Sequence, residues 1–124
     1  RRRVWRGLMD RAKRKALIQA YKLAFPPMGI YAIRNLRSGR VLIEQSANTT
    51  GALNRQRTQL RLGLHRIRDL QRDWRELGED AFAFEVLQAQ EPRAEPTFDY
   101  TAEREALLQS WRECIPPGSK DSYL

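Results

Sequence analysis

The arginines are the residues of this 124-residue chain best suited to chemistry, and they are gathered rather than spread. Residues 34–75 contain ten arginines and three acids, and residues 1–22 contain nine cations and one acid. Residues 76–124 reverse this balance, with four cations and eleven acids. A guanidinium forms paired hydrogen bonds to phosphate, which an ammonium group does not. The basic segments therefore predict a surface for a polyanion such as nucleic acid, and a merely solvated basic face is the simpler alternative.

Other kinds of site find little support in the sequence. Cys114 is the single cysteine and His65 the single histidine, which excludes an internal disulfide and a zinc site built from Cys and His. One cysteine suits a reducing compartment, and we expect a cytoplasmic protein. No stretch approaches the ~20 apolar residues that span a bilayer, so we expect no membrane partner. A basic helix over 1–22 lying on an anionic membrane is a further alternative, which weakens if Met9 is the natural start.

The apolar periodicity and the turn residues predict an α/β (α+β) fold with the element order α-β-β-α-α-β-α. The elements are a helix over 10–23, strands over 29–35 and 41–43, a helix from a cap at Asn48, Thr49 or Thr50 to Leu62, a helix over 69–77, a strand over 82–87, and a helix from a Thr101 cap to about Cys114. We expect a small three-stranded antiparallel sheet flanked by helices over 28–115. A basic N-terminal helix and linker over 1–27 precede it, and a loose tail over 116–124 follows.

Several of these segments resemble the GIY-YIG nucleases. Gly29-Ile30-Tyr31 opens the predicted hairpin as the first motif of that family does, and residues 40–44 lie where the family has Tyr-Ile-Gly. Further segments are similar to later motifs of the family in the same order: 45–48, 60–65, 70–74, 77–82, 84–87 and 103–105. The resemblance covers about residues 28–111, and it implies the fold of that family.

The resemblance also implies a reaction and roles for individual residues. The family hydrolyses phosphodiesters with one divalent ion, here Mg²⁺ or Mn²⁺, held by a glutamate. Tyr31 matches the first tyrosine of the family, a candidate general base or water-positioning group, and His65 matches a histidine found in some members. Glu105 matches the metal-binding glutamate, with Glu103 as the near alternative.

Four positions depart from the family pattern. Leu42 replaces the second tyrosine, Glu44 the glycine, Ala52 the catalytic arginine, and Gln56 a histidine one helical turn further on. Loss of one preorganised transition-state contact costs ~10²–10³ in rate, so we expect cleavage to be weakened or lost. Arg55 lies three residues after Ala52 on the same helix face, and its longer side chain could return a guanidinium to the catalytic site.

The sequence therefore predicts a nucleic-acid-binding, endonuclease-like protein, with DNA favoured over RNA as the partner. The cations expected to contact nucleic acid are Lys13, Arg14, Arg40, Arg55, Arg57 and Arg61. The alternative is an inactive pseudo-nuclease that serves as a protein-interaction module. In that case the acidic segment 76–124 would dock a protein partner or the basic segment of a second copy.

Overall fold

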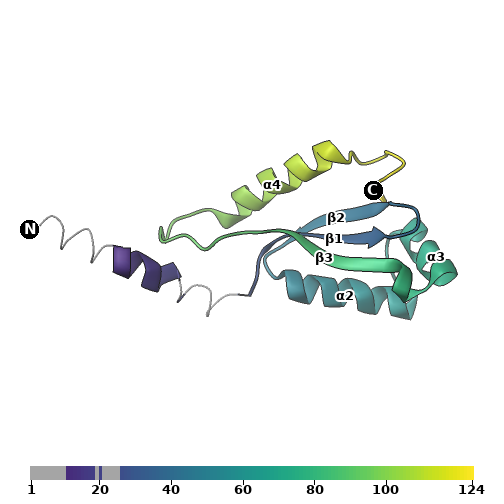
Figure 1. The fold of residues 1–124 in the computed structure, drawn as a ribbon, viewed down its shortest axis with the longest axis horizontal. Helices are drawn as coiled ribbons and strands as arrows, with labels where there is room; N and C mark the ends of the chain where they lie inside the picture. Colours follow the sequence, from purple (N-terminus) through teal and green to yellow (C-terminus); the bar gives the residue numbers. More distant parts are fainter. Residues whose placement is uncertain (1–10, 19, 21–25) are drawn as a thin grey trace, which may run out of the picture.

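The computed structural model describes residues 11–18, 20 and 26–124. Residues 11–18 and 20 are helical, and both ends of the predicted first helix lie outside the described residues. The elements that follow are β1 (Gly29–Asn35), β2 (Val41–Ser46), α2 (Thr49–Leu62), α3 (Arg68–Leu77), the short 3₁₀ helix η1 (Glu79–Ala81), β3 (Phe82–Ala89) and α4 (Tyr100–Cys114). The predicted element order is confirmed (Figure 1).

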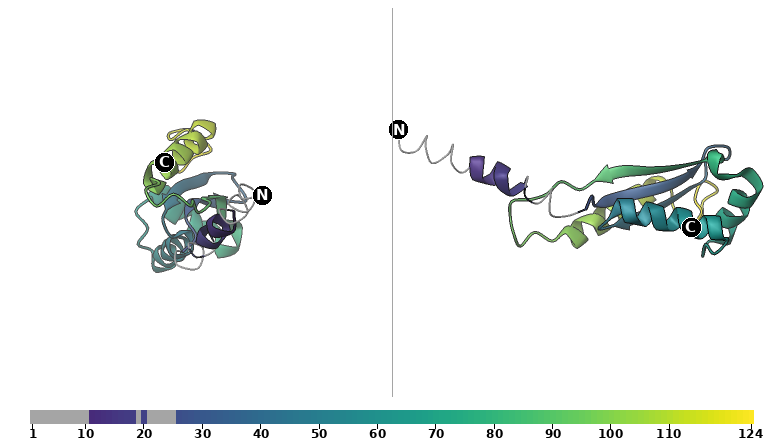
Figure 2. Two further views of the ribbon diagram at one scale, coloured as in Figure 1. Left: turned by 90° about the vertical axis from the view of Figure 1, so that its left-hand side faces the viewer. Right: turned by 90° about the horizontal axis from the view of Figure 1, so that it is seen from below.

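The three strands form one antiparallel sheet in the order β2-β1-β3. Because β1 is central, side chains are buried on both of its faces. Ile33 packs with α2 and α3 residues on one face, whereas Ile30 and Ala32 pack with Leu108 of α4 on the other. The two views of Figure 2 agree with this arrangement, with α2 and α4 on opposite sides of the sheet.

Local capping explains where the helices begin and end. The Asn48 side chain accepts a hydrogen bond from the Gly51 N–H at 2.9 Å and caps α2, as one of the three predicted candidates. Gly63 ends α2 in a left-handed conformation with φ of 74°, which glycine adopts without steric cost. The α4 cap is a correction: Asp99, not Thr101, accepts from the Ala102 N–H at 3.0 Å.

The expectation of a loose C-terminal tail is wrong for its last residues. Ser122 forms a parallel bridge with Val41 on the outer edge of β2, and Tyr123 is buried in the core. The Tyr123 hydroxyl accepts from Asn35 Nδ2 at 3.0 Å and donates to Asp73 Oδ2 at 2.7 Å. The buried Tyr123 and backbone hydrogen bonds to Val41 therefore together hold a segment whose proline- and glycine-rich start suggests an unstructured end.

No helix in the described part of the chain has the length and apolar character needed to cross a lipid bilayer.

Candidate functional site

Tyr31 lies in the centre of the sheet, on the face that α2 covers. Its side chain is 4% exposed, and its register partner on β2 is Glu44. The Gln56 side-chain amide of α2 donates a hydrogen bond from Nε2 to the Tyr31 hydroxyl at 3.0 Å. The tyrosine to which the family resemblance assigns a catalytic role is therefore held by Gln56, one of the four residues that depart from the family pattern.

The same glutamine joins Tyr31 to His65. Gln56 Oε1 is hydrogen-bonded to His65 Nε2, and His65 Nδ1 accepts from the Ile67 backbone N–H at 3.1 Å. Because Nδ1 is an acceptor, the proton of the neutral imidazole is on Nε2, where it is donated to Gln56. The structure thus brings together two of the predicted site residues, and Gln56 uses both ends of its amide to link them.

A second glutamine fixes the loop that carries His65. Gln71 of α3 is buried and accepts from the His65 backbone N–H at 3.0 Å through Oε1. Its Nε2 donates to the Leu60 carbonyl, also at 3.0 Å. One side chain therefore satisfies a backbone donor and a backbone acceptor at the corner between α2 and α3. Gln71 lies in the segment 70–74 that is similar to a family motif, but neither that resemblance nor the amphipathic helix pattern predicts these two hydrogen bonds.

The environment keeps both titratable groups of this cluster neutral. Burial raises the pKa of the Tyr31 phenol above its ordinary value, although the hydrogen bond from Gln56 opposes this. Burial, and then the nearby Arg66 charge, lowers the pKa of His65 below its ordinary value. At neutral pH the cluster is therefore a phenol, an amide and an uncharged imidazole. The Tyr31 hydroxyl proton has no acceptor among the described residues, so this group can donate a hydrogen bond to a ligand.

Charged side chains surround Tyr31. Glu44 lies 2.9 Å from Arg66 Nη2 and 3.3 Å from Arg112 Nη2, and Arg112 also donates to the Ile43 carbonyl at 3.2 Å. Two guanidinium groups thus compensate the carboxylate that replaces the glycine of the family motif. Arg55 is exposed on α2, and its charge is close enough to lower the pKa of Tyr31. Arg55 therefore lies in the neighbourhood of Tyr31, and its catalytic role stays a prediction.

Glu105 is placed differently. It is exposed on α4, the helix on the opposite face of the sheet from α2, and it forms no hydrogen bond or ion pair within the described residues. Glu103, the near alternative, is already bound by Arg93 at 2.9 Å and by Gln90 at 3.0 Å. No group of three or more His, Cys, Asp or Glu side chains suited to a metal ion occurs in the part of the chain that the structure describes.

Two solved structures match this arrangement of strands and helices. One is the catalytic domain of the homing endonuclease I-TevI, with a TM-score of 0.61 and 21% identity over 77% of this chain and 95% of that domain. The other is an alanine mutant of the catalytic domain of the intron endonuclease I-TevI, with a TM-score of 0.58 and 19% identity over 72% of this chain and 84% of that chain. I-TevI is a GIY-YIG nuclease. This chain has a GIY-YIG-like fold.

No family model matches the sequence, and no curated protein matches it either. The resemblance that the sequence motifs indicate is nevertheless confirmed at the level of the fold. In this GIY-YIG-like domain Gly29-Ile30-Tyr31 begins the central strand, and α4 is the helix that carries Glu105.

Three of the arginines expected to contact nucleic acid have partners within the protein. Arg61 binds Glu79 through two hydrogen bonds of 2.7 and 3.0 Å. Arg57 stacks on Phe84, with 4.4 Å from its guanidinium carbon to the ring centroid. Arg40 stacks on Tyr123 at 4.4 Å and reaches Asp69 at 3.3 Å.

The remaining cations expected to contact nucleic acid are on the surface. Arg14 lies 3.2 Å from Glu95, and Lys13 is exposed on the same helical segment. Arg55 is exposed and has no ion-pair partner in the described part of the chain. The contacts of these residues with nucleic acid stay predictions.

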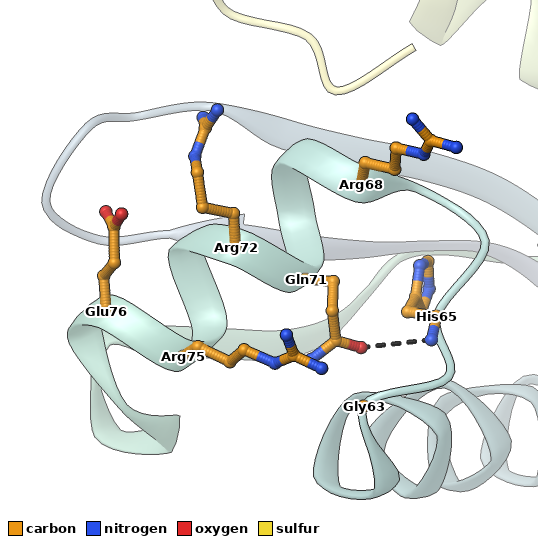
Figure 3. Close-up of a pocket in the computed structure, with 7 residues that line it drawn as sticks. All are labelled: Gly63, His65, Arg68, Gln71, Arg72, Arg75 and Glu76. Atoms are coloured by element: carbon orange, nitrogen blue, oxygen red, sulfur yellow. Dashed lines mark hydrogen bonds between the residues drawn. The ribbon is translucent and has the colours of Figure 1, made fainter.

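A hollow beside His65 was not expected from the sequence. It encloses about 460 Å³ between α3 and the end of α2 (Figure 3). Three exposed arginines of α3 contribute to its lining, whose members are Gly63, His65, Arg68, Gln71, Arg72, Arg75 and Glu76. Their spacing of four and three residues, which places side chains on one helix face, is the signal that could have located this site.

Proposed function

We propose that this GIY-YIG-like protein binds nucleic acid, DNA in preference to RNA, and that its capacity for phosphodiester hydrolysis is weakened or lost. The partner is supported by the matched structures, which are catalytic domains of endonucleases, and by the arginine-rich segment 34–75. The weakened chemistry is supported by one observation, the Tyr31–Gln56–His65 network.

That network leaves no general base in place. A base must accept a proton, but the Tyr31 phenol retains its own proton at neutral pH because burial raises its pKa. His65 accepts from Ile67 at Nδ1 and donates to Gln56 at Nε2, so neither ring nitrogen is available to a water molecule. What Tyr31 offers instead is a hydroxyl that donates to a phosphate oxygen, which is a binding contact.

The described residues do not form a metal site by themselves. Glu105 supplies one exposed carboxylate, and it belongs to no group of three or more acidic, histidine or cysteine side chains suited to a metal ion in the described part of the chain. A Mg²⁺ or Mn²⁺ ion would therefore depend on substrate phosphate and water for the rest of its shell. We derive no catalytic step through such an ion.

Arginines near Tyr31 would make the main contacts with the nucleic-acid phosphates. Burial raises the pKa of Tyr31, and the nearby charges of Arg55 and Arg66 partly oppose that rise, so both arginines lie near its hydroxyl. Both are also exposed. A phosphate that accepts a hydrogen bond from Tyr31 would meet these two guanidinium groups. Because Arg66 already neutralises part of Glu44, we expect Arg55 to make the larger contribution.

Fluorescence anisotropy with labelled single- and double-stranded DNA and RNA of one sequence tests the binding. Affinity should fall as salt rises, because each neutralised phosphate releases counterions. The double variant Arg55→Gln/Arg66→Gln should weaken binding and lower the salt slope by about one to two. The matched control Arg37→Gln/Lys120→Gln removes the same charge from exposed positions elsewhere and should change the affinity much less. Affinity independent of salt would contradict the proposal.

Incubation of labelled DNA with the protein and Mg²⁺ or Mn²⁺ tests the chemistry. We expect little or no cleavage, and any residual cleavage should disappear in Glu105→Ala. Efficient cleavage that survives Glu105→Ala would mean that the active groups lie elsewhere, or that a contaminating nuclease is present. Efficient cleavage that Glu105→Ala abolishes would show that the network does not block catalysis.

The occupied network also favours a second candidate, an inactive pseudo-nuclease that binds a protein. The acidic segment 76–124 would supply the docking surface for a basic partner or for a second copy. Failure of every nucleic acid to bind at moderate salt would favour this candidate over the first. The molar mass of the purified protein, measured by size-exclusion chromatography coupled to light scattering, then distinguishes self-association from binding to another protein.

A further inference from the structure

The hollow between α3 and the end of α2 has the features of an anion site. Arg68, Arg72 and Arg75 follow one another on α3 at spacings of four and three residues, so their side chains rise from adjacent helical turns. Arg75 extends along the hollow toward Gly63, whereas Arg68 stands nearer to His65 (Figure 3). These long side chains line one open cavity and can close on a small ligand within it.

Gly63 lets Arg75 approach the end of α2. A Cβ built on Gly63 would lie 2.7 Å from Arg75 Nη2, which is closer than a real side chain could be. The guanidinium therefore rests directly against the glycine backbone. Because Gly63 is also the left-handed residue that ends α2, the same position shapes the floor of the cavity and stops the helix.

The charge of the lining is not balanced. Three arginines face one glutamate, Glu76, and His65 is neutral at pH 7, so the lining carries a net charge of about +2. Arg72 forms ion pairs with two acids, the partly buried Asp73 at 3.4 Å and the exposed Asp69 at 3.5 Å. Neither Arg68 nor Arg75 forms an ion pair with any described residue. Two uncompensated guanidinium groups match the charge of a phosphate monoester, which is close to −2 at neutral pH.

We propose that this cavity binds a phosphate monoester dianion through Arg68 and Arg75, with Arg72 as a third donor. A volume of about 460 Å³ leaves room for the sugar and base that would carry the phosphate. The source of the ligand is either a free phosphate ester or the phosphorylated end of a nucleic-acid strand. The second source rests on the proposed function, whereas the phosphate site itself does not.

The class of ligand is tested by NMR titration of the full chain at pH 7.5 in chloride buffer. Methyl phosphate, a monoester dianion, should shift the backbone amides of Gly63, His65 and Arg75 in a saturable way. Dimethyl phosphate, a diester monoanion, should bind at least tenfold more weakly. The variant Arg68→Gln/Arg75→Gln should lose about tenfold in affinity per arginine. The charge-matched Arg37→Gln/Lys120→Gln should retain the native affinity.

Two results would overturn the phosphate site: shifts that do not saturate, or an equal loss of affinity in both double variants. Because all four substituted side chains are charged and exposed, circular dichroism should show native folding in both variants. If the pocket variant unfolds, Arg68→Lys/Arg75→Lys replaces it. That variant keeps the charge and loses the paired geometry, so it should bind methyl phosphate more weakly than the native protein.

The source of the ligand is tested with two oligonucleotides that differ only in a 5′-phosphate. Tighter binding of the phosphorylated strand by the native protein, but not by Arg68→Gln/Arg75→Gln, would support the strand end. Equal binding of the two strands would overturn the strand-end source. If methyl phosphate saturates the site while neither strand binds, the proposed function fails and the phosphate site stands.

Discussion

Replacing Gln71 by methionine tests whether this buried amide holds the corner between α2 and α3. Methionine has a similar volume and no side-chain N–H or C=O, so the variant loses both hydrogen bonds of 3.0 Å with little change in packing. The His65 N–H is then left without a partner, whereas the Leu60 carbonyl still accepts from the Gly63 backbone N–H at 3.2 Å. A buried unsatisfied group costs ~1–3 kcal/mol, so we expect the free energy of unfolding to fall by ~1–3 kcal/mol.

Urea unfolding measures this change, with Gln59→Met as the control. Gln59 lies on α2, and its side chain forms no hydrogen bond with any described residue, so this variant should lose well under 1 kcal/mol. The NMR signals of the His65 ring should also move in Gln71→Met, because the loop that carries the ring loses its anchor. Equal midpoints for the two variants would refute the reasoning, since the amide would then contribute nothing beyond its volume.

Three further predictions concern other contacts. Tyr123→Phe should lower the free energy of unfolding by ~1–3 kcal/mol, because Asn35 Nδ2 and Asp73 lose a buried partner, and urea unfolding measures this. Burial raises the pKa of Tyr123 to about 12, so native stability should fall as pH rises from 10 to 12, and this loss should be absent in Tyr123→Phe. Because burial lowers the pKa of His65, the folded protein resists its protonation. Stability should therefore fall as pH drops below ~6.5, less steeply in His65→Gln, and thermal melts across pH 5–8 measure the difference.

Much of the fold could be predicted because its signals are local. The hairpin is set by a turn at Arg37-Ser38-Gly39 between two β-rich runs, and α2 by a cap at Asn48 and a stop at Gly63. The motif order around Gly29-Ile30-Tyr31 then pointed to the fold that the structural comparison confirms. Each of these signals needs only a few neighbouring residues, so single-sequence reasoning can detect it.

The last residues of the chain show what such reasoning cannot detect. Tyr123 is 88 residues from Asn35 and 50 from Asp73, and no pattern near Tyr123 announces either hydrogen bond. From the sequence, Gln56 is a departure from the family pattern and His65 is a candidate site residue, and nothing relates the two. Only the three-dimensional arrangement shows that Gln56 supplies the carbonyl oxygen that accepts the His65 Nε2 proton.

The charge of Glu44 should oppose phosphate binding when only the sequence is considered, but neighbouring arginines compensate it in the structure. An anion opposite Tyr31 should repel a phosphate, and the sequence offers no compensation for it. In the fold, Arg66 and Arg112 approach its two carboxylate oxygens from different elements. The repulsion is therefore largely cancelled, but Arg66, one of the ten arginines of the basic segment 34–75, is used in cancelling it. Binding strength then depends on where the arginines without an ion pair among the described residues lie, such as Arg55 beside Tyr31 and Arg68 with Arg75 in the hollow, rather than on the net charge of the chain.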